Sequence, residues 1–229
     1  MHPSYYPNQL LKIFKWPVAL CAIAALPFVV MALGDSPLAD LRLAQCQWLA
    51  MGAGAYCVAW YLLFRHQFAG SYFSTFEHEL THALFAWATL HRVTGLTVTW
   101  RDGGVCTYEG SGGGNWLITI APYWFPTLVW PPILLTYWMD APALPTLNIL
   151  TGVAIAYHVT STWRETHREQ TDLQKTTFLF AAMFLPTANL LVYGTILLIA
   201  TTGADDAVAF MADVWARMWT FTQAHLLTG

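Results

Sequence analysis

The sequence has few charged side chains. Asp, Glu, Lys and Arg make up 10% of its 229 residues, whereas an ordinary soluble domain has about 25%. So few charges cannot cover a water-exposed surface. Hydrophobic residues make up 56% of the chain, and they occur in long runs rather than at amphipathic spacing. The composition therefore excludes a soluble globular protein and predicts a protein embedded in the lipid bilayer.

An excess of positive charge is also missing. The 10 Lys and Arg are outnumbered by 13 Asp and Glu, and the net charge is −3. We therefore expect no nucleic-acid partner, because such partners require a basic surface. The sequence also has no C-x-x-C pair among its four cysteines, which are Cys21, Cys46, Cys57 and Cys106. Three of them lie in apolar runs and are expected to pack as small hydrophobic residues.

Six apolar stretches are long enough to predict membrane helices. They cover residues 16–33, 46–64, 72–90, 116–139, 147–163 and 177–200. The fourth stretch is expected to be kinked or broken, because it contains Pro122, Pro126, Pro131 and Pro132. A last segment, about 207–227, places Asp213 and Arg217 one turn apart among tryptophans, which is typical of an interfacial helix. We therefore predict an all-α membrane protein: one integral membrane domain over 1–229, with a bundle of about six transmembrane helices.

A polar, glycine-rich stretch from 91 to 115 separates the third and fourth spans. Two short β-prone runs, 97–100 and 105–108, flank Asp102-Gly103-Gly104. This pattern predicts a short β-hairpin, followed by a flexible Gly-Ser-Gly-Gly-Gly turn that ends at Gly114.

The third span contains the motif H-E-x-x-H, formed by His78, Glu79 and His82. On a helix, this spacing places the two histidines one turn apart on the same face, where both can bind one Zn²⁺ ion. Glu79 lies beside the metal and can take a proton from a zinc-activated water and pass it to a leaving amine. These are the groups that peptide-bond hydrolysis requires.

The position of this motif in an apolar span gives it weight. One charged residue at the centre of a membrane helix costs about 2.5–3.5 kcal/mol, and this span has two glutamates and two histidines. A bound divalent cation would offset much of that cost. The alternative is a polar network that only holds helices together. Glu77 is expected to form a hydrogen bond to a neighbouring helix or to a metal ligand rather than to bind the metal.

A hydrolytic zinc site needs a third protein ligand, and the candidates are His158, His167 and Asp172. The third and fifth spans cross the membrane in the same direction, so depth can be compared at 1.5 Å per residue. The histidine pair lies about 12 Å into its span, and His158 lies about 16 Å into the fifth. Asp172 would lie about 37 Å in if that helix continued. The sequence therefore favours His158 as the third ligand, with Asp172 as the alternative.

With H-E-L-T-H at 78–82 in a membrane helix, followed by a β-hairpin and further spans, the chain resembles the site-2 protease family of intramembrane zinc metalloproteases. It is most similar to the small bacterial branch without a PDZ domain. The resemblance implies a multi-pass protease of the cell inner membrane that cleaves membrane-anchored proteins, with zinc on His78 and His82 and Glu79 as the catalytic residue. It also implies that residues 96–108 pair with an unwound segment of the substrate.

The sequence departs from this family in one respect. The family usually takes its third zinc ligand from the aspartate of an L-D-G motif, and this chain has no L-D-G. Either His158 replaces that aspartate or the site is built differently. Asn189, about midway along the sixth span, is expected either to orient the scissile carbonyl or a ligand, or to bridge helices.

We therefore predict a zinc metalloendopeptidase with a metalloprotease-like core at about 72–200, whose partners are the lipid bilayer and a membrane protein substrate. Two other functions fit parts of the sequence. One is a non-catalytic assembly or scaffold subunit with a structural or vestigial zinc site. The other is an ion transporter that uses His78, Glu79 and His82 for conduction. The sequence leaves the substrate, the membrane orientation and the oligomeric state open.

Overall fold

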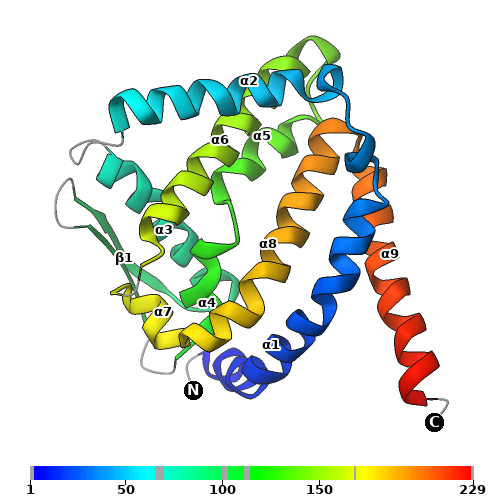
Figure 1. Cartoon of the computed structure of the whole chain (residues 1–229). Helices are drawn as coiled ribbons and strands as arrows, with labels where there is room; N and C mark the ends of the chain where they lie inside the picture. The colour runs from blue at the N-terminus through cyan, green and yellow to red at the C-terminus, as the bar shows by residue number, and fades with distance from the viewer. Residues whose placement is uncertain (1–2, 65–69, 100–102, 111–113, 168, 228–229) are drawn as a thin grey trace. The chain divides into compact units, whose positions relative to one another are not determined.

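Helices make up most of the chain, because a helix satisfies its own backbone hydrogen bonds without water. The computed structural model describes residues 3–64, 70–99, 103–110, 114–167 and 169–227. The longer helices in Figure 1 are α1 (Tyr5–Gly34), α2 (Leu43–Ala59), α3 (Gly70–Ala88), α6 (Leu144–Glu165), α8 (Phe178–Thr201) and α9 (Ala204–Thr222). Three shorter helices are α4 (Trp116–Ile120), α5 (Trp130–Leu135) and α7 (Thr171–Thr176).

Fewer than six helices among the described residues qualify as candidate membrane spans by length and composition. Among the described residues, three helical segments are long and apolar enough to cross a bilayer: Tyr5–Gly34, Ala141–Glu165 and Phe178–Thr201. A fourth candidate, Trp116–Tyr123 with Thr127–Leu135, is bent by 64°. The predicted six spans are therefore not confirmed. Helix α2 has only 17 residues, about 25 Å of a core that is about 30 Å thick, and α3 carries the polar motif.

Contacts divide the chain into two compact units. The first consists of Met1–Pro17 and Trp48–Ala181, and the second of Val18–Gln47 and Ala182–Gly229. The first unit contains the H-E-x-x-H helix and the β-hairpin. The expectation of a single integral membrane domain stays a prediction.

The second unit has an apolar core of its own. Its buried side chains come from the later part of α1, from α8 and from α9, and they are Val29, Ala32, Leu198, Ala207, Phe210 and Val214. Arg217 of α9 forms 2.8 Å ion pairs with Asp213, one turn earlier, and with Asp35. The predicted C-terminal helix is thus present over Ala204–Thr222, and its location at the membrane interface stays a prediction.

The predicted β-hairpin is confirmed. Strand β1 (Val93–Val98) pairs with β2 (Gly104–Tyr108) in an antiparallel register that places Val98 opposite Gly104. Gly103 has a φ of +81°, which a residue without a side chain adopts freely. Strand β1 begins four residues before the predicted run. The predicted residues Trp100 and Asp102, and residues 111–113 of the glycine-rich turn, lie outside the described residues.

Helices α2 and α6 cross where each contributes a buried glycine. A Cβ atom on Gly52 would overlap the carbonyl oxygen of Ile149, and one on Gly152 would overlap the carbonyl oxygen of Leu49. Backbone therefore packs directly on backbone at this crossing, as small residues allow in membrane helices.

We expect Gly52→Ala to destabilise the protein by about 1–3 kcal/mol, because the added methyl group must push two helices apart. The matched control is Gly54→Ala in the same helix, since a Cβ there meets nothing within 4 Å. Thermal unfolding in detergent should show a lower midpoint for the first variant and no loss for the second. Equal midpoints would contradict the close crossing.

Candidate metal centre

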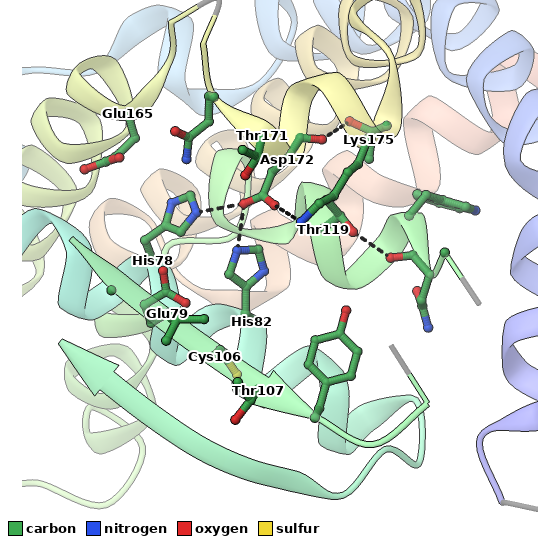
Figure 2. Close-up of a pocket in the computed structure, with 18 of the residues that line it drawn as sticks. His78, Glu79, His82, Cys106, Thr107, Thr119, Glu165, Thr171, Asp172 and Lys175 are labelled. Carbon is green, nitrogen blue, oxygen red and sulfur yellow. Dashed lines mark hydrogen bonds and ion pairs between the residues drawn. The ribbon is translucent and has the colours of Figure 1, made fainter. Parts of the chain in front are cut away.

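The polar face of α3 lies inside the first unit. His78, Glu79 and His82 are each 8% exposed, and the spacing of one turn turns both imidazoles to the same side. Their Nε2 atoms both face Oδ2 of Asp172, at 3.2 Å from His78 and 3.0 Å from His82. Figure 2 shows the three side chains pointing toward one another. One ligating atom from each residue lies within 4.8 Å of the other two.

Asp172 reaches the histidines because α6 ends earlier than the sequence reading assumed. The helix stops at Glu165, and the short helix α7 begins at Thr171 and packs against α4. Asp172 is in the first turn of α7, where a carboxylate is favoured by the helix dipole. Its other oxygen, Oδ1, lies 3.7 Å from Nζ of Lys175. Burial disfavours the charged carboxylate, but hydrogen bonds from His78 and His82 outweigh it and hold the pKa of Asp172 below its usual range.

The structure reverses the sequence-based preference between His158 and Asp172. His158 is buried, and its Nε2 atom lies 3.1 Å from the carbonyl oxygen of Pro122. Because a carbonyl oxygen only accepts, this nitrogen donates its proton there. His158 is absent from the group of converging ligand atoms. The depth comparison was wrong because it extended α6 in a straight line past Glu165. His167, the third candidate, is not in the group either.

A carbonyl group fixes the orientation of His82. Nδ1 of His82 lies 2.8 Å from the carbonyl oxygen of Ile118 in α4 and must carry the proton in that hydrogen bond. This bond turns Nε2 toward Asp172, and Nε2 would bind a metal after giving up the proton that it shares with the Asp172 carboxylate. Helix α4 is itself anchored by Asn115, whose side-chain oxygen accepts hydrogen bonds from the backbone N–H groups of Leu117 and Ile118. The N-terminal cap of α4 therefore helps to set the ring orientation of His82.

The bent span forms the back of the site. Its break exposes backbone groups, and α3 satisfies one of them: the N–H of Leu128 donates to Oε1 of Glu77 at 3.0 Å. Thr81 and Thr127 share a hydroxyl–hydroxyl hydrogen bond of 2.7 Å. The ring of Tyr123 packs edge-on against the imidazole of His78, with ring centroids 5.5 Å apart. Glu77 therefore bonds to another segment, as predicted, rather than joining the metal-binding group.

Strand β2 passes directly over Glu79. The backbone N–H of Cys106 forms a hydrogen bond with the Glu79 carboxylate. The approach is close at Gly104, where a Cβ atom would lie only 2.7 Å from Cγ of Glu79. Burial, together with the charge of Glu79, raises the pKa of the Cys106 thiol to about 11, so the thiol stays protonated at neutral pH. The strand thus holds the glutamate beside the histidines without adding a second charge.

A cavity of about 1100 Å³ opens onto these residues. It is lined by the metal-binding group, Glu79, the hairpin residues 103–108, the first turns of α1 and the start of α4. This volume exceeds the range of about 300–1,000 Å³ that is common for small-ligand pockets. The cavity is therefore large enough for a segment of a polymer next to the candidate metal centre.

The donor set fits zinc. Two imidazoles and one carboxylate are ligands that zinc prefers, and three protein ligands leave one position open in a tetrahedral site. Neighbouring ligands of a tetrahedral zinc are about 3.4 Å apart, since each zinc–ligand bond is about 2.0–2.2 Å long. The separations of 3.0 and 3.2 Å between Oδ2 of Asp172 and the two nitrogens are close to that value.

Asn189 belongs to the second unit. Its side-chain amide donates to the carbonyl oxygen of Leu185, one turn earlier in α8, at 2.9 Å. The predicted contact with a substrate carbonyl therefore stays a prediction, and so does the bridge between helices.

One sequence signal pointed to Asp172. Residues 164–172 are almost entirely polar, which argues against a continued membrane helix. Asp172 and Lys175 also have the order expected for the first and last turns of a short helix. Together these features indicate a helix end near residue 165 and a new start near 171.

Comparison with known proteins agrees with the geometry. A family model described as Peptidase M50B-like matches residues 48–226, which include His78, Glu79, His82 and Asp172. No curated protein and no solved structure matches the chain.

Proposed function

The chain belongs to the Peptidase M50B-like family, and from this premise we propose that it is an intramembrane zinc metalloprotease that hydrolyses peptide bonds of membrane-anchored proteins. The observation that carries the proposal is the convergence of His78, His82 and Asp172 beside Glu79 in one cavity. The apolar helices and the family match together indicate that the chain is a membrane protein. We place it in the cell inner membrane as a multi-pass protein.

His78, His82 and Asp172 would hold the zinc ion. When bound, zinc supplies Lewis acidity that makes water more acidic and polarises a carbonyl group. Glu79 accepts the proton that water loses and donates it to the nitrogen of the leaving amine. The N–H of Cys106 orients the Glu79 carboxylate for both transfers.

The β-hairpin offers a strand edge to which a substrate segment can bind. Residues 103–108 line the same cavity as Glu79, and an extended peptide segment can hydrogen-bond to a strand edge. A substrate helix must unwind before its backbone becomes available in this way. We therefore expect cleavage near a segment of the substrate that unwinds readily.

A non-catalytic scaffold subunit would need a different number of protein ligands to zinc. A structural zinc site is closed by four protein ligands, whereas three converge among the residues that the structure describes. The large cavity beside them also favours a site that admits a substrate. Both observations support the protease over the scaffold.

Cleavage is expected to depend on zinc. The chain, reconstituted in lipid vesicles, should contain about one zinc ion and cut members of a panel of tagged single-span membrane proteins. A zinc chelator should abolish the cut fragments, and added Zn²⁺ should restore them where Mg²⁺ does not, because Mg²⁺ prefers six oxygen ligands. Mass spectrometry of the fragments is the measurement. Fragments that persist in metal-free protein would refute the proposed function.

A further inference from the structure

All three lysines of the chain line the cavity of the candidate metal centre. They are Lys12 and Lys15 in the first turns of α1, and Lys175 in α7. Four of the seven arginines belong to the described residues, and none of these four lines the cavity. The lysines of the chain thus cluster at one cavity. Lys12 and Lys15 lie before residue 48, where the family match begins.

The first turns of α1 are fastened to the site by a buried polar network. The side chain of Asn8 accepts a 3.0 Å hydrogen bond from the amide of Asn115, the residue that caps α4. The amide nitrogen of Asn8 lies 3.0 Å from Nε2 of His91, whose Nδ1 lies 3.0 Å from the hydroxyl of Thr89. All four side chains are less than 10% exposed. A fully bonded network of this kind holds its members in one arrangement.

Two further contacts fix the lysine-bearing wall. The indole N–H of Trp116 donates to the carbonyl oxygen of Leu11 at 2.6 Å. Nζ of Lys15 lies 5.3 Å from the ring centroid of Phe180 and 5.4 Å from that of Trp16, within the range of cation–π attraction. The ammonium group of Lys15 is therefore held by aromatic rings, and the described residues provide no carboxylate partner for it.

Lys12 and Lys15 differ from Lys175 in their charged neighbours. Lys175 is paired with Asp172, and Asp172 also faces both histidines. The described lining residues include three carboxylates, from Glu79, Glu165 and Asp172, and the three lysines balance their charge before any metal is counted. A divalent cation on the His–His–Asp group makes the lining net positive. The excess positive charge lies on the α1 wall.

We propose that Lys12 and Lys15 form a recognition wall for an acidic side chain in the peptide segment that enters the cavity. The residues belong to the proposed substrate site, so this inference rests on the proposed function and narrows its substrate class. An acidic side chain on the substrate would be attracted to the wall, while a basic one would be repelled. The wall lies on α1, before the segment that the family model matches.

The test uses three metal-binding probes: the hydroxamates of Leu-Glu, Leu-Gln and Leu-Lys. A hydroxamate binds zinc without being cleaved, so affinity is measured apart from catalysis. Calorimetry on the full chain in zwitterionic detergent at low ionic strength should show the glutamate probe binding about three- to ten-fold tighter than the glutamine probe. The lysine probe should bind weakest. Added salt should shrink these ratios, because the charges are partly solvated.

The variants are Lys12→Gln with Lys15→Gln, the charge reversal Lys12→Glu with Lys15→Glu, and the control Arg92→Gln. Arg92 is 79% exposed and pairs with Glu109 away from the cavity. The double glutamine variant should lose the preference for the glutamate probe, the reversal should prefer the lysine probe, and the control should keep the wild-type ratios. Equal melting temperatures among the variants show that each is folded.

The outcomes separate the two proposals. If no probe binds, the metal centre is absent, and the proposed function fails together with this inference. If all three probes bind with equal affinity, only the inference fails. A further outcome would also overturn the inference: the three probes bind equally, and native mass spectrometry shows anionic lipid on the wild type but not on the double glutamine variant. Lys12 and Lys15 would then bind lipid headgroups rather than a substrate side chain.

Discussion

Replacing Glu79 with glutamine is expected to abolish cleavage while leaving zinc bound. Glutamine keeps the shape of the side chain and an oxygen for the Cys106 N–H, but it cannot take a proton from water or return one to the leaving amine. Positioned acid–base groups contribute about 10²- to 10⁴-fold, so kcat/KM for a cleaved membrane substrate should fall by at least about 10³-fold. The assay measures fragment formation and metal content on the same sample.

Glu77→Gln is the matched control for this prediction. Glu77 is two residues away on the same helix and accepts the N–H of Leu128, which the oxygen of a glutamine also can do. This variant should keep both zinc and cleavage within a few-fold of the wild type. If Glu79→Gln cleaved as fast as Glu77→Gln, the role of Glu79 in proton transfer would be excluded. If Glu79→Gln lost its zinc, the glutamate would instead be needed to hold the metal.

Asp172→Asn is expected to weaken zinc binding far more than His158→Ala. Asp172 faces both histidine Nε2 atoms, and its amide analogue removes the negative charge that attracts the cation. Changing a residue that only orients a zinc ligand costs about 10- to 100-fold in metal affinity, so losing the charged ligand should cost at least about 100-fold. Competition with a fluorescent zinc chelator measures both variants on one scale.

His158→Ala tests the alternative ligand directly. His158 donates to the carbonyl oxygen of Pro122 at 3.1 Å, and the hydroxyl of Thr162 donates to the same oxygen at 3.4 Å. Removal of His158 therefore takes away the shorter of two hydrogen bonds and should cost about 0.5–1.5 kcal/mol of stability. Thermal unfolding should therefore report a lower midpoint while zinc affinity stays near the wild-type value. The reverse pattern, with zinc lost from His158→Ala and kept by Asp172→Asn, would restore the sequence-based choice of His158.

Local features of this protein follow from short stretches of its sequence. The apolar runs predict helices because each run satisfies its backbone internally. His78 and His82 share a face because four residues make about one helical turn, and this requires no knowledge of the rest of the chain. The hairpin follows from two β-prone runs around Gly103, whose φ of +81° the turn requires. These predictions depend on residues close together in sequence, and the structure agrees with each.

Tertiary packing sets which residue joins His78 and His82 in the candidate metal centre, and it sets where the candidate spans among the described residues begin, bend and end. His78 and Asp172 are 94 positions apart, and their meeting depends on α6 ending at Glu165 and on α7 packing against α4. A comparison of depths along straight helices cannot detect such a turn. The bend of 64° between α4 and α5 is likewise possible because Glu77 and Thr81 of another helix satisfy its free polar groups. Pairing between distant segments is set by packing and hydrogen bonds across the fold, and local sequence patterns do not encode it.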